Sequence, residues 1–92
     1  MDNVSIEIYE GVAYGLNSHT EGDRNIAIGE ASHAEGHGVK SIGYYSHAEG
    51  YFTTTQGRYS HAEGYKSKAI NTSSHAEGHL TEATGEMSHA EG

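Results

Sequence analysis

The chain has 92 residues, of which 34% are hydrophobic, and it contains one Phe, no Trp and no Cys. This length allows one domain at most, and so few large apolar side chains cannot fill the core of an ordinary globular monomer. The formal charge of −8, with five Lys and Arg residues in total, argues against nucleic acid as a partner. Without Cys, disulfides and thiolate metal sites are excluded.

Residues 1–17 differ from the rest of the chain. Val4, Ile6 and Ile8 alternate with other residues, which predicts a half-buried strand that Gly11 and Gly15 interrupt. The segment has neither a basic stretch nor a long apolar run, so we expect no signal peptide and no membrane insertion. We expect residues 1–17 to form an N-terminal cap or connecting strand.

From residue 18 onward one pentad recurs. Ser-His-Ala-Glu-Gly begins at residues 32, 46, 60, 74 and 88, and the near copy Ser-His-Thr-Glu-Gly begins at residue 18. The spacing is fourteen residues every time, which indicates one stacked structural unit rather than a disordered acidic tract. We expect residues 18–92 to be the repeat domain, with repeats continuing past Gly92 because the last unit is incomplete.

A second pentad lies between the copies of the first, as in Asn25-Ile26-Ala27-Ile28-Gly29. Both follow the pattern small-x-small-x-Gly, except for Asn71 at one fifth position, and five such residues make a short strand. Gly and Asn readily adopt positive φ, so the fifth positions are expected to be turns. Two strands and two turns close one coil of an all-β, parallel β-roll with two sheets back to back. The expected turn residues are Gly22, Gly29, Gly36, Gly43, Gly50, Gly57, Gly64, Gly78 and Gly85.

The small residues are expected inside the roll. Burying the His and Glu side chains instead would cost several kcal/mol per ion without good pairing. The expected interior residues are Ser32, Ala34, Ser46, Ala48, Ser60, Ala62, Ser74 and Ala76. Such a thin interior buries little apolar area, so we expect each chain to need partner chains. His and Glu recur in every copy while the outward residues of the second pentad vary, so the uniform face is the expected interface.

The fourteen-residue small-x-Ala-x-Gly pattern over residues 18–92 resembles the YadA-like head repeats of trimeric autotransporter adhesins. The resemblance implies a left-handed parallel β-roll that forms a homotrimer around an axis. In that family apolar residues occupy the interface positions. The matching positions here are His19, Glu21, His33, Glu35, His47, Glu49, His61, Glu63, His75, Glu77, His89 and Glu91.

The His-Ala-Glu variant resembles repeats of phage and prophage tail proteins. This implies a structural or adhesive fibre segment, located on a virion tail or an extracellular surface, with a host cell-surface receptor and carbohydrate as one candidate ligand. An alternative places the Asn25–Gly29 half at the axis, because that pentad resembles the hydrophobic family motif more closely. That arrangement would bury Lys40 and Lys68, which disfavours it.

Two explanations of the His-Glu face remain open. Imidazole can donate to carboxylate, so three chains could close rings of charge-assisted hydrogen bonds in each layer, with no cofactor. A metal ion on the trimer axis is the other explanation, with His33, His47, His61 and His75 as the candidate ligands. The alternative function is a metal- or small-ligand-binding solenoid, either a monomer or an assembly, that uses the outward His-Glu face.

The remaining His and most of the aromatic residues lie outside the Ser-His pentads, near the expected turns. His37 and His79 are expected as exposed turn residues. An aromatic strip for carbohydrate is the alternative use of the turns, formed by Tyr44, Tyr45, Tyr51, Phe52, Tyr59 and Tyr65. Catalysis is not expected, because Ser points into the roll while His points out, and motifs such as a phosphate loop are absent.

Overall fold

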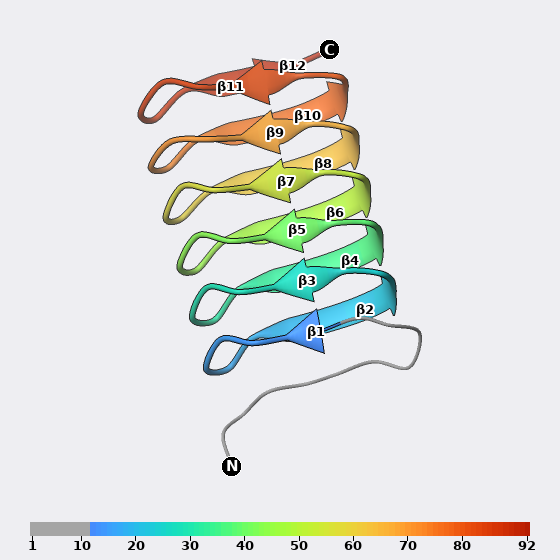
Figure 1. Ribbon diagram of the computed structural model, residues 1–92. Coiled ribbons are helices and arrows are strands. Elements are labelled where there is room, and N and C mark those ends of the chain that lie inside the picture. The colour runs from blue at the N-terminus through green and yellow to red at the C-terminus, as the bar shows by residue number, and fades with distance from the viewer. Residues whose placement is uncertain (1–11) are drawn as a thin grey trace.

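The computed structural model describes residues 12–92, which form a β-solenoid of short parallel strands (Figure 1). One sheet contains the longer strands β2 (His19–Asp23), β4 (His33–His37), β6 (His47–Tyr51), β8 (His61–Tyr65), β10 (His75–His79) and β12 (His89–Glu91). The other sheet contains the two-residue strands β1 (Val12–Ala13), β3 (Ile26–Ala27), β5 (Lys40–Ser41), β7 (Thr54–Thr55), β9 (Lys68–Ala69) and β11 (Glu82–Ala83). We call these the long-strand and short-strand sheets.

Every strand pairs with the strand fourteen residues away, in parallel and in repeat register. His33 pairs with His47, and Ala34 with Ala48, on neighbouring long strands. Lys40 pairs with Thr54, and Thr54 with Lys68, in the other sheet. The expected all-β parallel solenoid with fourteen residues per coil is therefore confirmed.

The solenoid includes residues ahead of the first Ser-His pentad. β1 pairs with β3 through Val12 to Ile26 and Ala13 to Ala27. Half a coil thus precedes residue 18, within the segment expected to cap or connect the stack. The strand predicted around Val4, Ile6 and Ile8 lies outside the described residues.

The interior is thin and made of small side chains. Apart from Val39, the buried hydrophobic residues among those described are all Ala. Alternation along each strand sends the first and third pentad residues inward. The residues expected inside are all at most 2% exposed, namely Ser32, Ala34, Ser46, Ala48, Ser60, Ala62, Ser74 and Ala76.

The Ser that begins each Ser-His pentad is bonded within its own turn. The Ser32 hydroxyl donates to the Gly29 carbonyl over 2.6 Å, and the Ser46 hydroxyl does the same to Gly43. The backbone amide of Ser32 also donates to the Gly29 carbonyl. The Ser therefore closes the turn that precedes it, and its buried hydroxyl is satisfied.

The turns differ from the expectation that the fifth pentad residue adopts positive φ. Gly22, Gly36, Gly50, Gly64 and Gly78 do so, with φ between 108° and 120°, but they lie inside the long strands. Gly29, Gly43, Gly57 and Gly85 do not. In the corners the left-handed residue comes two positions later and is often bulky, as in Tyr45 (φ 57°) and Phe52 (φ 54°). The hydrogen bond from Ser32 N to Gly29 O closes a β-turn, and the positive φ of its third residue, Ala31 (φ 56°), is the feature of a type II turn.

Close stacking explains Gly29, Gly43 and Gly57, which do not have positive φ. A Cβ atom added to Gly29 would lie 2.3 Å from the carbonyl oxygen of Gly43 in the next coil. A Cβ on Gly43 would lie 2.1 Å from the oxygen of Gly57. Both contacts are with backbone atoms, so a side chain would force the coils apart.

Candidate functional site: the His-Glu face

The outer surface of the long-strand sheet carries the His and Glu of every pentad, and we call it the His-Glu face. Each long strand begins with His and has Glu as its third residue. The residue between them is buried, so alternation sends His and Glu outward together. The sheet thus brings all the expected interface residues to one side of the solenoid.

The imidazole rings form a continuous stack. Adjacent ring centroids lie 4.6 to 4.9 Å apart from His33 to His89, with interplanar angles of 1° to 8°. His19 continues the stack at 4.9 Å but is tilted by 39°. This spacing is the strand repeat of a β-sheet, so the stack follows from the register.

Each imidazole is paired with the carboxylate of its own pentad. His33 Nε2 lies 2.6 Å from Glu35 Oε1, and His47 Nε2 lies 2.7 Å from Glu49 Oε1. The three later pairs have distances of 2.8 Å. In the first pentad His19 Nε2 lies 3.8 Å from Glu21 Oε2, and the buried hydroxyl of Thr20 has no hydrogen-bond partner among residues 12–92. The carboxylate accepts from Nε2–H, which leaves Nδ1 of the neutral ring as the lone-pair atom.

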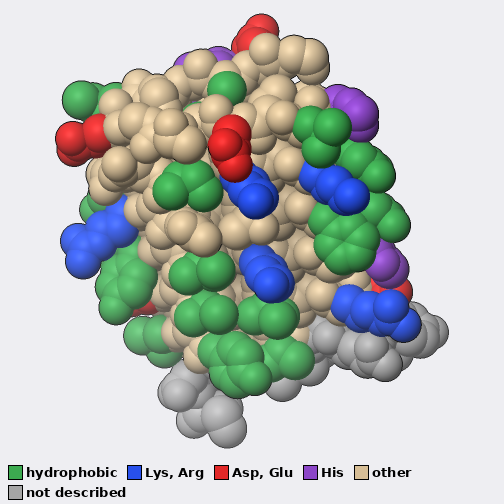
Figure 2. Space-filling model, turned by 45° about the horizontal axis from the view of Figure 1, so that its top comes forward, with side chains coloured by type: hydrophobic (Ala, Val, Ile, Leu, Met, Phe, Trp, Pro, Cys, Tyr) green, Lys and Arg blue, Asp and Glu red, His purple; other side chains and the backbone are tan. Residues whose placement is uncertain are grey.

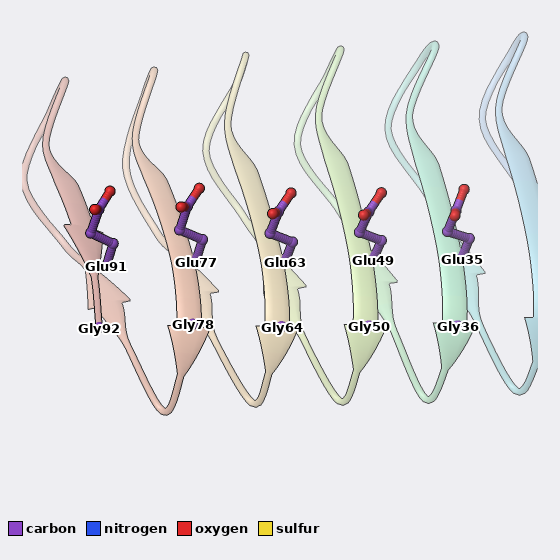
Figure 3. Close-up of a pocket in the computed structure, with 10 residues that line it drawn as sticks. All are labelled: Glu35, Gly36, Glu49, Gly50, Glu63, Gly64, Glu77, Gly78, Glu91 and Gly92. Carbon is purple, nitrogen blue, oxygen red and sulfur yellow. The ribbon is translucent and has the colours of Figure 1, made fainter.

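The Glu side chains line a groove along the solenoid. Figure 3 shows five of them projecting in parallel from successive coils, above a row of glycines. The groove has a volume of about 560 Å³ and is lined by Glu35, Gly36, Glu49, Gly50, Glu63, Gly64, Glu77, Gly78, Glu91 and Gly92. The face is therefore acidic wherever its His residues are neutral.

Parts of this face have the ligand types of a metal site. Within residues 12–92, three groups bring their ligand atoms within 4.8 Å of one another, namely His19/Glu21/His33, His33/Glu35/His47 and His75/Glu77/His89. Of the four expected ligands, His33, His47 and His75 belong to these groups, and His61 belongs to none among the described residues. Parallel stacked rings direct their in-plane lone pairs side by side, so one ring must turn before two can bind the same ion.

The Ser and His of a pentad lie on opposite sides of the sheet. Ser46 is 2% exposed and donates to Gly43, while His47 faces outward and pairs with Glu49. The arrangement therefore forms no nucleophile–base pair within the pentad.

The aromatic residues form two separate groups at the two corners of the coil. At one corner Tyr45 stacks on Tyr59 at 5.4 Å, and Tyr44 contacts Tyr45 edge-on. At the other, Tyr51 stacks on Tyr65 at 5.2 Å, and Phe52 lies edge-on to Tyr51. The single aromatic strip that the sequence offered as an alternative use of the turns is thus divided.

His37 and His79 extend the second aromatic group. They were expected as turn residues, but they are the last residues of β4 and β10 and are in register with Tyr51 and Tyr65. His37 stacks on Tyr51 at 5.2 Å, and His79 lies 4.7 Å from Tyr65. In the sequence His37, Tyr51, Tyr65 and His79 share the position one residue after the pentad Gly, and this shared position is the signal for the second aromatic group.

Comparison with known protein families and with curated proteins finds no match for this chain. Among residues 12–92 there is no helix long and apolar enough to cross a membrane.

Proposed function

We propose that the chain is a segment of a trimeric structural or adhesive fibre, part of a phage tail fibre or another receptor-binding surface appendage. In this proposal three left-handed rolls pack around an axis through their His-Glu faces, on a virion tail or an extracellular surface. The observation that carries the proposal is the unbroken register of His and Glu along one face. The resemblance of the repeat to YadA-like heads supports the same assembly.

The energetics of the interior favour partner chains. In residues 12–92 the core consists of Ala, Ser and Thr with one Val and one Asn, which offers little apolar burial against about 1 to 2 kcal/mol of backbone entropy per residue. Packing three chains together adds buried area without enlarging any one interior. The His-Glu face suits this role because its composition does not vary from coil to coil.

The His-Glu pairing within one chain leaves one imidazole nitrogen and one carboxylate oxygen of each pair available for hydrogen bonds to neighbouring chains. Nε2 of His47 is bonded to Oε1 of Glu49, and in the described residues neither Nδ1 of His47 nor Oε2 of Glu49 has a hydrogen bond. These atoms can join adjacent chains in each layer, while the intrachain bond orients them beforehand. A chain shifted along the axis would leave such polar groups unpaired, so the rings also select the register.

The mass in solution tests this proposal. Sedimentation equilibrium of the full chain should give about 29 kDa, three times the chain mass of 9.8 kDa. A stable species at the mass of one chain would contradict it.

The metal- or small-ligand-binding solenoid is the second candidate, favoured by the three His/Glu/His groups. A metal-ligating His commonly donates its other ring N–H to a carboxylate, and each His here has such a Glu partner. A chain of this kind would bind ions as a monomer, with Nδ1 as the ligand atom. We propose no catalytic role, because the hydroxyls of the pentad Ser residues donate to turn carbonyls on the opposite side of the sheet from the His side chains.

A further inference from the structure

A second hollow lies away from the His-Glu face, at the corner where each long strand leads into a short strand. It has a volume of about 440 Å³ and is lined by Phe52, Lys66, Lys68, Leu80, Thr81 and Glu82. Phe52, Lys66 and Leu80 closely follow the long strands β6, β8 and β10, while Lys68 and Glu82 begin β9 and β11. Figure 2 shows Lys and Arg side chains interspersed with hydrophobic side chains on the side of the molecule that carries the short strands.

The walls of this hollow are held by the backbone of the solenoid. Phe52, Lys66 and Leu80 occupy the same left-handed corner position in three successive coils, with φ of 54°, 56° and 60°. Their amides donate to the carbonyls of the preceding coil over 2.8 Å. The three side chains therefore project in a row whose spacing is set by the stack, and the hollow exists before a ligand arrives.

The two ammonium groups at the hollow have no carboxylate partner. Within residues 12–92, neither Lys66 nor Lys68 lies within 4.0 Å of a carboxylate oxygen, although Glu82 is the register partner of Lys68. Lys66 Nζ instead lies over the Tyr65 ring, 5.4 Å from its centroid. In a chain with a formal charge of −8, two such lysines beside one hollow favour an anionic ligand.

The remaining lining residues limit the kind of anion. Phe52 and Leu80 are 44% and 62% exposed and offer apolar walls. The Thr81 hydroxyl is already bonded to the Glu77 carbonyl and to Ser67. The polar groups that remain are therefore the two ammonium donors and the Glu82 carboxylate, which accepts hydrogen bonds.

We propose that this hollow binds a carboxylated pyranose, the acidic sugar unit of a uronic or sialic acid. The C–H face of the ring would pack on Phe52 and Leu80, the sugar carboxylate would pair with Lys66 and Lys68, and a ring hydroxyl would donate to Glu82. Two other ligand classes fit less well. A neutral sugar would leave the lysines without an anionic partner, and a fatty acid would place its apolar chain against the Glu82 carboxylate. This inference deepens the proposed receptor-binding role, since the short-strand sheet faces outward in the proposed trimer.

Titration of the ¹⁵N-labelled full chain by NMR tests the site. The probes are sodium glucuronate and sodium N-acetylneuraminate, with glucose and sodium acetate as controls. Both acidic sugars should shift the amides of residues 52, 66–68 and 80–82, and bind at least about tenfold more tightly than either control. Lys68→Gln should weaken glucuronate binding about tenfold, whereas Lys40→Gln, at the same register position two coils away, should change it less than about twofold.

Several outcomes overturn the site. Equal binding of glucose would mean that the lysines play no part, and equal binding of acetate would reduce the effect to simple ion pairing. An absence of shifts, or equal losses in the Lys40 and Lys68 variants, would also contradict it. Sedimentation of the same samples keeps the two proposals apart: a monomer that binds glucuronate refutes the trimer alone, and a trimer that does not bind it refutes this site alone.

Discussion

Replacing Gly43 with Ala tests whether close stacking of coils, rather than backbone conformation, requires glycine at the corner. Gly43 does not have positive φ, so Ala introduces no torsional strain there. Its Cβ would lie 2.1 Å from Gly57 O, whereas an ordinary contact begins at 3.4 Å. The coils must therefore separate locally by about 1.3 Å.

That separation lengthens the hydrogen bonds on either side of the contact. Ile42 N donates to Thr55 O over 2.8 Å, and Tyr59 N donates to Tyr44 O over 2.9 Å. Losing both costs about 1 to 3 kcal/mol, and overpacking adds a similar amount, so Gly43→Ala should destabilise the protein by about 2 to 6 kcal/mol.

Gly85→Ala is the matched control for this experiment. Gly85 occupies the same repeat position, but its nearest neighbour to an added Cβ is Ser88 Cβ at 3.6 Å. Its free energy of unfolding should change by less than about 0.5 kcal/mol. Urea denaturation followed by circular dichroism measures both variants, and equal destabilisation of the two would refute the reasoning.

Three further predictions concern the interior and the His-Glu face. Ser46→Ala should lower the free energy of unfolding, measured by urea denaturation, by about 1 to 3 kcal/mol, because it leaves the buried Gly43 carbonyl and Ser41 hydroxyl without this partner. The control Ser88→Ala removes the same kind of bond at an exposed site and should cost less than about 1 kcal/mol. Equal losses in the two variants would contradict the role of burial. Replacing all six motif His residues with Ala should abolish the trimer in sedimentation experiments, and an unchanged trimer with an unchanged melting temperature would remove the interface proposal. If hydrogen bonds alone join the chains, dialysis against EDTA should leave the melting temperature unchanged, with no stoichiometric metal by elemental analysis; a loss that zinc restores would favour the metal-binding solenoid.

Most of the fold could be predicted from the strict fourteen-residue period of the sequence. A constant spacing, small residues at alternate positions and a fifth-position glycine predict two strands per coil and identify the interior residues such as Ser46 and Ala48. The half coil at β1 was missed, although Gly11-Val12-Ala13-Tyr14-Gly15 follows the same small-x-small-x-Gly pattern. Its interior residue Ala13 fits the pattern, but no Ser-His pentad precedes it to mark the repeat.

The parts that sequence reasoning did not predict depend on how neighbouring coils meet. Residue type alone favours Gly at a left-handed position, yet Tyr45 and Phe52 occupy such positions because the corner is closed by hydrogen bonds between coils. The pairing of His47 with Glu49 in the same strand depends on side-chain rotamers, so the sequence predicted only that both face outward. The Lys66 and Lys68 hollow combines residues from three coils, and no motif marks it.

Because the coils have identical length and register, the length of the solenoid is proportional to the number of repeats. Each fourteen-residue unit contributes one strand spacing, about 4.8 Å, to the length of the rod. Removing or duplicating a whole unit joins the same pairs of positions as before, so the sheets, the glycine contacts and the His stack all continue across the junction. Changes in repeat number can therefore alter the reach of the rod during evolution while its cross-section and its uniform face stay the same.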